Sequence, residues 1–457
     1  MGVSGIGLGF RPALGGELLA DARVVDFVEV VAETCRQGPG RAEARALTAL
    51  WPVVPHGVKL SLGSAEGIDV ARAKELGRLA RELRSPVVSE HVSFVRSGGR
   101  EIGHLTELPH TRDAVKVVAK NVATLRRHLP DVPLLLENVA RNFLWADGEM
   151  SEGEFYGEIV RATGCGLLLD VGNLYANAVN AGVSAHALLE RYPLEAVAML
   201  HVAGGTWDGG FYFDTHAHPI PPEVLDLVDR ACAARPGVPI LLERDGGLDD
   251  PRQVLEEVRL LRAIHERHVS AGLREVSLAA PPPVEVDAPA LEAAQTRIAA
   301  LLVDPPDGAP PAPGDPSPEA VRRARGVLER KRADDALPLL HGLASRICPA
   351  EALALGQLDT APRPRAMAAV ADAMRIAKGA REQARLSRFA VEDELVLRAR
   401  FSGDAAPAPR RMPFLGRARL PGGGSAWAWK PPGAGAPVRL WRRGGGAVTS
   451  PEKEERR

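Results

Sequence analysis

The first 270 residues repeat one pattern of apolar and polar positions. A short run of apolar or β-branched residues ends in polar residues, and a longer segment with helical spacing of its apolar positions follows. Eight such runs occur: Gly5–Phe10, Asp26–Glu33, Val53–Leu62, Pro86–Phe94, Pro133–Val139, Gly166–Tyr175, Ala196–Gly205 and Pro239–Asp245. Several are almost continuously apolar, such as PLLLEN, GLLLDVGN and PILLER. Such runs are typical of strands that are buried on both faces in a parallel sheet.

The segments between these runs predict amphipathic helices, for example Asp69–Arg84, Thr111–His128 and Pro222–Ala234. Eight strand–helix units in about 260 residues fit a (β/α)8 barrel, the TIM barrel. An open doubly wound sheet is the alternative, but it does not need eight units. No GxGxxG motif follows the first strand, as it would in a dinucleotide-binding fold. We therefore expect an α/β protein that is built on a TIM barrel.

Residues that can bind metals stand at the ends of successive predicted strands. In chain order they are Glu33, His56, Glu90, His91, Glu137, Asn138, Asp170, Asn173, His201, Glu243 and Asp245. The C-terminal ends of barrel strands meet on one face, where active sites of this fold lie. Each residue alone has a structural alternative, as a core histidine, a helix cap, a turn brace or part of a local ion pair. Charged residues are rarely buried without partners, so their recurrence on strand after strand predicts one shared site.

The stretch from His201 to Pro219, HVAGGTWDGGFYFDTHAHP, adds candidates in a glycine-rich loop that returns through Asp214, His216 and His218. A polar surface loop with solvated histidines is the alternative for this stretch. Imidazole and carboxylate side chains without cysteine suit iron, manganese or zinc. The ligand types alone do not decide between redox and hydrolytic chemistry.

The full set of candidate metal ligands is His56, His91, Glu137, Asp170, His201, Asp214, His216 and Glu243. Eight ligands exceed the roughly four to six that one ion takes. We therefore expect two or three ions, and a carboxylate that bridges them. Glu137, in the middle of the strand order, is the natural bridge.

The composition changes after the predicted barrel domain, which we place at residues 1–270. Residues 271–316 are rich in Pro, Ala and Gly and predict a linker, with one short helix at Ala288–Leu302.

A mainly helical accessory region is expected over residues 317–401, beginning with Ser317 as a helix cap and Pro318 at the first helical position. Its last part, Arg388–Phe401, alternates apolar and charged residues as a strand or an amphipathic helix would. Residues 402–457 contain many Gly and Pro residues and are expected to form a largely disordered tail.

Composition and charge narrow the class of protein. The chain of 457 residues is 45% hydrophobic and 25% charged, with a formal net charge of −1. This charge gives no support to a nucleic acid partner. The sequence has neither a signal-peptide pattern nor an apolar run of the roughly 18 residues that a membrane span needs. Its four cysteines, Cys35, Cys165, Cys232 and Cys348, form no CxxC motif. We expect a cytoplasmic protein that binds neither nucleic acid nor membranes.

Nine stretches of the chain, in order, carry a resemblance to a known family: GIGLGFRP, FVEVVAE, VPHGVKLSLG, SEHVSF, LLLENV, LLLDVGNLY, HVAGG, DTHAHP and LLERD. Residues 4 to about 268 resemble the multinuclear non-haem iron-dependent oxidative enzymes. That family includes the methanobactin biosynthesis oxidase and enzymes that modify cysteines of ribosomally made peptides. The resemblance implies a (β/α)8 barrel with two to three iron ions in a mixed Fe(II)/Fe(III) state.

The resemblance also implies roles for individual residues. His56, His91 and Glu137 would bind one iron, and Glu137, Asp170, His201 and Glu243 a second. Asp214 and His216 would bind a third, more weakly held ion. His218 would support that ion or carry protons, whereas Asn138 and Asn173 would lie behind the ligands or in the substrate pocket. Catalytic roles are thereby implied for Glu137, Asp170, His218 and Asn173.

The reaction implied by the resemblance is an O2-dependent oxidation of cysteine residues in a precursor peptide. Such enzymes often need a separate partner protein that recognises the peptide leader, and residues 317–401 are an alternative source of that recognition within the chain. The main rival function is a divalent-metal hydrolase or isomerase on the same barrel, similar to endonuclease IV or xylose isomerase. Fold alone does not separate these functions. A binding protein with an inactive barrel is a third class.

Overall fold

The computed structural model describes residues 2–443, except residues 37, 146–147, 270–285, 304–314, 359–366, 385, 404–406 and 422. It divides into two compact units. The first contains Met1–Ala299 and Gly308–Ala320, and the second contains Ala300–Asp307 and Val321–Arg457.

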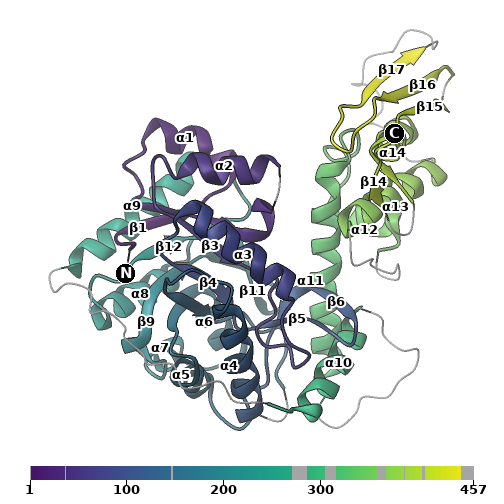
Figure 1. Ribbon diagram of the computed structural model, residues 1–457. Helices are drawn as coiled ribbons and strands as arrows, with labels where there is room; N and C mark the ends of the chain where they lie inside the picture. Colours follow the sequence, from purple (N-terminus) through teal and green to yellow (C-terminus); the bar gives the residue numbers. More distant parts are fainter. Residues whose placement is uncertain are drawn as a thin grey trace. The chain divides into compact units, whose positions relative to one another are not determined.

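The first unit contains a closed barrel of eight parallel strands (Figure 1). The strands are β1 (Ile6–Gly9), β2 (Phe27–Val31), β3 (Val53–Gly57), β4 (Val88–His91), β7 (Leu134–Glu137), β8 (Gly166–Asp170), β9 (Val197–Val202) and β12 (Ile240–Leu242). Around the barrel the order is β1-β12-β9-β8-β7-β4-β3-β2, so each strand pairs with its sequence neighbour among the eight, and β12 closes on β1. Each of the eight predicted runs contains one of these strands, which confirms the TIM barrel.

Helices surround the barrel on the outside (Figure 1). They are α1 (Gly15–Ala20), α2 (Pro39–Leu47), α3 (Val70–Leu83), α4 (Arg112–Arg126), α5 (Glu152–Thr163), α6 (Val171–Asn180), α7 (Ala185–Leu189), α8 (Pro222–Ala234) and α9 (Pro251–Arg267). Short 3-10 helices follow β1 (η1, Pro12–Leu14) and β2 (η2, Ala32–Cys35) and precede β9 (η3, Leu194–Ala196).

Local sequence explains where these helices begin. The Asp69 side chain accepts hydrogen bonds from the backbone N–H groups of Ala71 and Arg72 at the start of α3. Ser151 and Glu154 form a reciprocal capping box at the start of α5. Each cap satisfies N–H groups that have no partner within the helix.

Apolar side chains fill the barrel interior, with Phe27, Leu135, Met199 and Leu241 in one buried cluster. The strand glycine Gly7 makes room for this packing. A Cβ atom on Gly7 would lie 2.4 Å from the ring of Phe27, closer than real side chains approach. The small residues of β1 therefore let a large ring enter the barrel.

Two antiparallel hairpins extend the ends of barrel strands, and neither was predicted. One is β5 (Phe94–Ser97) with β6 (Arg100–Thr106), and the other is β10 (Gly204–Asp208) with β11 (Phe211–His218). The second hairpin replaces the expected glycine-rich loop after β9. Its turn residues Gly209 and Gly210 both have positive φ angles, of 57° and 80°. Two consecutive positive φ angles are what a tight two-residue hairpin turn requires.

A helix in the predicted linker packs against the barrel. This helix, α10 (Pro289–Val303), contains the expected short helix. Gln295, with no exposed surface, accepts a hydrogen bond from Ala65 N at 2.9 Å and donates one to Gly63 O at 2.7 Å. The expectation of a linker is therefore corrected for α10 as far as Ala299, which belongs to the barrel unit. Residues 270–285 and 304–314 of the predicted linker lie outside the described residues.

The second unit has a helical core, in agreement with the mainly helical region that was predicted. Its helices are α11 (Pro318–Ala336), α12 (Pro349–Gly356), α13 (Ala368–Glu382) and α14 (Ser387–Arg400), with a 3-10 turn η5 at Leu337–Leu339. Ser317 caps α11 by accepting a hydrogen bond from Ala320 N at 3.2 Å. Arg332 of α11 forms two hydrogen bonds with the buried Asp372 of α13. The alternating segment at the end of this region is a helix, α14.

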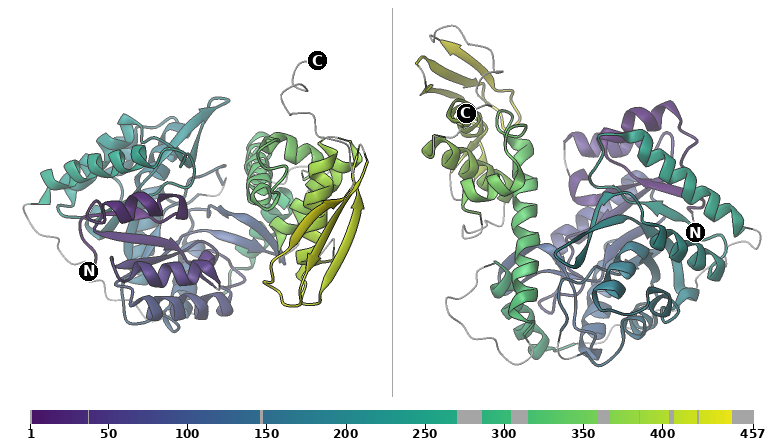
Figure 2. Two further views of the ribbon diagram at one scale, coloured as in Figure 1. Left: turned by 90° about the horizontal axis from the view of Figure 1, so that it is seen from above. Right: turned by 180° about the vertical axis from the view of Figure 1, so that it is seen from behind.

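The expected largely disordered tail is wrong for residues 414–443, which form a three-stranded antiparallel sheet. The strands are β15 (Phe414–Arg419), β16 (Ser425–Lys430) and β17 (Arg439–Arg443), and a short pair, β13 (Phe401–Ser402) with β14 (Ala408–Pro409), precedes them. Figure 2 shows the three strands lying across one side of the helices of this unit. Small residues explain the packing, because Ala426 and Ala428 are buried against Leu395 and Ala399 of α14. Residues 444–457 lie outside the described residues.

The state of the cysteines and the length of the helices bear on the expected environment of the chain. Three of the cysteines are buried and Cys348 is exposed, and all four are free thiols. Among the residues that the model describes, no helix combines the length and the apolar character that crossing a bilayer requires.

A buried carboxyl group, Glu107, joins loops at the C-terminal end of the barrel. It follows β6, and its Oε1 accepts a hydrogen bond from Phe143 N, in the loop after β7, at 2.8 Å. The indole of Trp145 in the same loop donates to Glu107 O at 3.0 Å. Glu107 is only 2% exposed and its Oε2 has no hydrogen-bond partner, so burial raises its pKa to about 7. This group is therefore close to protonation at neutral pH.

Replacing Glu107 with Gln should change how stability depends on pH. The pKa is higher in the folded protein than in the unfolded chain. Glu107 therefore contributes stability that is complete below about pH 4.5 and is lost as pH rises through about 7, by up to about 3 kcal/mol. The Glu107→Gln variant does not lose this stability. The difference between its melting temperature and that of the natural protein should therefore shift in favour of the variant as pH rises from about 5 to about 8. Glu256→Gln, at an exposed position of α9, is the matched control. A Glu107→Gln difference that stays constant across this range would contradict the prediction.

Candidate metal centre

Six neighbouring barrel strands bring the predicted ligands to one end of the barrel. His56, His91, Glu137, Asp170 and His201 lie at or next to the C-terminal ends of β3, β4, β7, β8 and β9. Glu243 follows the last residue of β12. These strands are consecutive in the barrel order, so their ends form an arc around the same mouth. The parallel strands thus bring residues that are up to 187 positions apart in the sequence close together in space.

Glu137 lies at the centre of this arc and divides its carboxylate between two sets of histidines. Its Oε2 is 3.3 Å from His56 Nε2 and 3.3 Å from His91 Nε2. Its Oε1 is 3.0 Å from His201 Nδ1, which is also 3.3 Å from Glu243 Oε2. All these side chains are buried. One carboxylate oxygen thus serves each side, as a carboxylate that bridges two ions would.

Each of the three histidines is held from behind by its other ring nitrogen. His56 Nδ1 contacts Ser89 Oγ at 2.8 Å, and His91 Nδ1 contacts Gly57 O at 3.1 Å. His201 Nε2 contacts Glu29 Oε2 at 3.2 Å. An outer hydrogen bond of this kind fixes the ring and leaves the inward nitrogen as a lone-pair donor, the usual arrangement of metal-binding histidines.

The inward-facing atoms are left without hydrogen-bond partners. The buried unsatisfied atoms include His56 Nε2, Glu137 Oε2, Asp170 Oδ2, His201 Nδ1 and Asp214 Oδ1. Burying polar atoms without partners costs about 1–3 kcal/mol each, and more for charged groups. Five such atoms on neighbouring side chains are explained if cations satisfy them. The donor set therefore fits metal ions.

Three groups of donors are close enough together to hold an ion. They are His56 with His91 and Glu137; Glu137 with Asp170, His201 and Glu243; and His216 with Glu243 and Asp245. The first two groups have the membership that the family resemblance implied for two ions, with Glu137 in both. The third group differs from the predicted third site, which consisted of Asp214 and His216. The group combines His216 with Glu243 and Asp245 and does not contain Asp214.

Asp214 and His216 are nevertheless neighbours at the edge of the centre. His216 Nε2 hydrogen bonds to Asp214 Oδ2, and His216 Nδ1 is 3.3 Å from Glu243 Oε2. His216 has a φ of +53°, which is uncommon for a residue with a side chain. Such backbone strain is often found at functional sites. The β10–β11 hairpin thus supplies the outer wall of the centre.

Two asparagines brace Asp170. The side-chain amide of Asn138 donates to Asp170 O at 2.9 Å and accepts from Asp170 N at 2.8 Å. Asp170 Oδ1 caps α6 by accepting from Asn173 N, and Asn173 Nδ2 donates to Asn138 O. These bonds leave Asp170 Oδ2 free to face the centre. Asn138 and Asn173 therefore position a candidate ligand from behind.

His218 lies apart from the donor groups. Its side chain is exposed, its Nδ1 contacts Thr215 Oγ1 at 2.7 Å, and none of the three groups found among the described residues contains it. The structure thus brings seven of the eight predicted metal ligands into groups, with Asp214 beside them and His218 outside.

The pKa values reflect a centre in which charges of both signs are crowded together. Burial alone would raise the pKa of Glu137, but His201 and His91 outweigh it and lower this pKa to about 2. Burial would lower the pKa of His91, but Glu137 and Glu90 raise it to about 9. Burial and the charge of Asp214 raise the pKa of Asp170 to about 7. Protons thus balance the carboxylates, and metal ions would replace those protons on binding.

Two charged residues at the centre were not singled out from the sequence. Glu29 lies in the middle of β2, within the apolar run FVEVV, and contacts His201. An acidic residue inside a buried strand was the available signal. Arg11, which follows β1, forms ion pairs with Asp245 and, at 3.6 Å, with Glu243. It fixes the carboxylates of the third donor group from outside.

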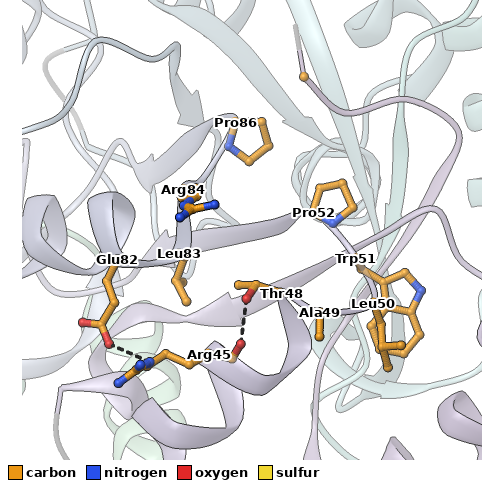
Figure 3. Close-up of a pocket in the computed structure, with 11 residues that line it drawn as sticks. Arg45, Thr48, Ala49, Leu50, Trp51, Pro52, Glu82, Leu83, Arg84 and Pro86 are labelled. Carbon is orange, nitrogen blue, oxygen red and sulfur yellow. Dashed lines mark hydrogen bonds and ion pairs between the residues drawn. The ribbon is translucent and has the colours of Figure 1, made fainter.

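A large cavity lies at the other end of the barrel. Figure 3 shows the side chains that line it. The cavity has a volume of about 760 Å³ and is lined by residues of α2 and α3 and by Trp51, Pro52 and Pro86, which precede β3 and β4. These are the N-terminal ends of the strands, where residues of this fold serve stability rather than chemistry. Its lining includes the ion pair of Arg45 with Glu82 but none of the candidate ligands.

Comparison with known proteins gives one family. Residues 5–266 match the model of a family described as "RiPP precursor modification enzyme MbnB/TglH/ChrH". A UPF0276 protein of Streptomyces avermitilis is 40% identical over 286 residues, which are 60% of this chain and 57% of that protein. The chain thus spans little more than half the length of this relative. A UPF0276 protein of Rhizorhabdus wittichii is 37% identical over 267 residues, which are 58% of this chain and 95% of that protein.

Solved structures show weaker likeness. Endonuclease IV from Thermus thermophilus has 21% sequence identity and a TM-score of 0.38, over 57% of this chain and 99% of that chain. A xylose isomerase domain protein from Planctomyces limnophilus has 15% identity and a TM-score of 0.39, over 59% of this chain and 99% of that chain. No functional inference is drawn from likeness at this level.

Removing Glu137 should release more metal than removing one histidine. Glu137→Ala takes a donor from two groups, whereas His56→Ala takes a donor from one. We expect His56→Ala to lose up to one ion per chain and Glu137→Ala to lose more than one, measured by elemental analysis of the purified protein. His186→Ala, which removes a surface histidine paired with Asp226, is the control. Equal losses in Glu137→Ala and His56→Ala would argue against a shared carboxylate.

Removing the carboxylate behind His201 should weaken one donor group selectively. Glu29→Gln keeps the size of the side chain but removes the charge that holds His201 Nε2. Loss of such an outer partner typically weakens metal affinity about 10–100-fold. In competition with a chelator, Glu29→Gln should weaken the binding step of the Glu137–Asp170–His201–Glu243 group. Ser89→Ala, behind His56, should weaken the other step. A Glu29→Gln chain that releases its metals like the natural protein would refute this role.

Proposed function

The chain belongs to the MbnB/TglH/ChrH family of RiPP precursor modification enzymes, and on this premise we propose that it is an O2-dependent iron enzyme that oxidises cysteine residues of a ribosomally made precursor peptide. The family supplies the substrate class, a peptide that is modified after synthesis on the ribosome. The iron, the O2 and the cysteine are the proposed part.

The observation that carries the proposal is the set of unsatisfied donors around Glu137. Two buried histidines, His56 and His201, and the carboxylates of Glu137 and Asp170 belong to the donor groups and have inward atoms that lack hydrogen-bond partners. Histidine and carboxylate donors without cysteine suit iron among the redox-active metals. The free cysteines of the described chain join none of the three donor groups, so a substrate thiolate would be the only sulfur ligand.

We assign each donor group to one ion. His56, His91 and Glu137 would hold the first ion, and Glu137, Asp170, His201 and Glu243 would hold the second. His216, with help from Asp214, Glu243 or Asp245, would hold a third ion more weakly. Two to three irons in a mixed Fe(II)/Fe(III) state would supply redox chemistry with O2 and would keep a coordinated thiol deprotonated.

The protein side chains have separate tasks in this proposal. Glu137 would be shared by the first two ions, because its two oxygens face different donor groups. Asn138 and Asn173 keep Asp170 oriented through three hydrogen bonds, and a fourth joins the two asparagines. His218, exposed on β11 and hydrogen bonded to Thr215, is suited to carry protons between the centre and water. The expected cytoplasmic location and a separate leader-recognition partner remain predictions.

The test begins with metal analysis of protein purified without oxygen, with EPR and Mössbauer spectroscopy of any iron. Two to three irons per chain, with a mixed-valent signal that a cysteine-containing peptide perturbs, are expected. O2 consumption should then require the cysteine peptide, and the same peptide with serine in its place should not support it.

The rival function gives different results in the same samples. A hydrolase or isomerase would hold zinc or manganese with little iron, even after expression with added iron, and would turn over without O2. That outcome would refute the iron oxygenase and make phosphodiester or sugar substrates the next assay. His218→Gln should slow O2 consumption without changing metal content, and a loss of iron in that variant would instead make His218 a ligand.

A further inference from the structure

The three-stranded sheet of the second unit has two unlike faces. Strand register places Leu415, Trp429 and Arg439 in one row, Arg417, Trp427 and Trp441 in the next, and Arg419, Ser425 and Arg443 in the third. Side chains alternate between faces along each strand, so these nine residues share one face. We call it the tryptophan–arginine face. The other face carries Ala426 and Ala428, which pack on α14.

The tryptophan–arginine face is exposed. Trp429 is 38% exposed, Trp441 is 40% exposed and Leu415 is 65% exposed. Large aromatic side chains normally lose most of their exposed surface in a folded protein, and a group of them that remains exposed marks an interaction surface. The rings are also ordered by their neighbours, since Trp427 and Trp441 stack with centroids 6.3 Å apart and planes 9° apart.

The charge of this face is entirely positive. It carries four arginines and no acidic residue. Two arginines lie over tryptophan rings, Arg417 at 5.2 Å from Trp427 and Arg439 at 6.0 Å from Trp429. In the described part of the chain none of the four forms an ion pair, whereas Arg442, whose side chain lies on the opposite face, pairs with Glu392 of α14. Arg417 and Arg439 are thus held beside tryptophan rings, and no carboxylate of the described residues pairs with the four guanidinium groups.

The part of the chain around this face also carries a net positive charge. Residues 321–443 contain 24 Lys and Arg against 11 Asp and Glu, whereas residues 1–320 contain 30 against 44. An excess of positive charge around a binding surface attracts anionic partners and speeds their association. The complement of this face is therefore a negatively charged partner with apolar groups.

We propose that the tryptophan–arginine face docks an acidic segment of the precursor peptide, with carboxylates on the arginines and apolar side chains on the tryptophans. This proposal rests on the proposed function, because the family identifies the substrate as a peptide. Arginine binds carboxylates with two parallel hydrogen bonds, and tryptophan and arginine are the residues most often found where binding energy concentrates. The face would hold a part of the peptide that is distinct from the cysteine to be modified.

A basic surface with tryptophans is also a known platform for single-stranded nucleic acid. The family favours the peptide, because its members modify peptides. The two partners are separated by experiment, since an oligonucleotide and a peptide can be offered to the same protein.

The experiment measures binding by the full-length, metal-loaded chain with fluorescence anisotropy. The probes are a short fluorescein-labelled peptide that alternates Glu with Leu, its twin with Gln in place of Glu, and a labelled oligothymidylate. The variant Arg417→Gln/Arg439→Gln removes two charges of the face. The control Lys378→Gln/Arg398→Gln removes two charges from α13 and α14, where each side chain is 62% exposed and forms only a long ion pair.

We expect the acidic peptide to bind more tightly than its Gln twin and than the oligothymidylate, with an affinity that falls as salt rises. Arg417→Gln/Arg439→Gln should weaken binding about tenfold or more, and the control should change it less than about twofold. Trp441→Ala, at an exposed site on the edge strand, should also weaken binding, and circular dichroism should show that each variant is folded.

Three outcomes would overturn the proposal: no binding of the acidic peptide, binding that the face variants leave unchanged, or tighter binding of the oligothymidylate at the same face. Anisotropy requires no turnover, so the result is independent of the barrel chemistry. Peptide binding by this face without O2 consumption would refute the iron oxygenase alone. Oxidation of a cysteine peptide together with unchanged binding in the face variants would refute the docking surface alone.

Discussion

The candidate metal centre is arranged around one buried charge, the carboxylate of Glu137. It has 1% of its surface exposed and meets three histidines whose inward nitrogens are aimed at it. A carboxylate in such a place needs positive charge near it, and protonated His201 and His91 would supply it, which lowers the pKa of Glu137 to about 2 against the opposing effect of burial. Protons alone do not satisfy every atom that could bind a metal. Glu137 Oε2 and His201 Nδ1, for example, have no hydrogen-bond partner. Cations that replace the protons would resolve both the charge and the geometry.

The support behind the histidines makes the two principal donor groups unequal. His56 Nδ1 rests against the hydroxyl of Ser89 and His91 Nδ1 against a backbone carbonyl, with Glu90 Oε1 farther away at 3.8 Å, whereas His201 Nε2 contacts the carboxylate of Glu29 at 3.2 Å. A carboxylate behind an imidazole raises its basicity more than a neutral acceptor does. The group that contains His201 also has three carboxylates, against one in the other group. It should therefore favour the higher-charged ion, which is how a mixed-valent pair could be assigned to two fixed positions.

Most of this centre could be predicted from the sequence because the C-terminal ends of the strands of a barrel meet on one face. His56, His91, Glu137, Asp170 and His201 were found from their places in eight recurring runs, without any knowledge of distances. Glu29 was missed because it lies inside its strand, where the pattern indicates packing, and only the closure of the barrel brings β2 close enough to β9 for Glu29 to contact His201. The β10–β11 hairpin was missed because glycines indicated a loop. The sheet over residues 414–443 was missed because Gly and Pro in its turns obscured short strands whose inward residues are alanines.

The net charge of the whole chain likewise conceals the charge of its separate regions. The net charge of −1 argued against an anionic polymer as a partner, yet it is the sum of an acidic region up to residue 320 and a basic region over residues 321–443. Electrostatic attraction acts over about 8–10 Å in physiological salt, so a binding surface responds to its own region rather than to the total. A partner that approaches the tryptophan–arginine face therefore meets positive charge, whatever the barrel carries. The whole-chain value has no bearing on that encounter, and the choice between an acidic peptide and a nucleic acid depends on the chemistry of the face and of the family.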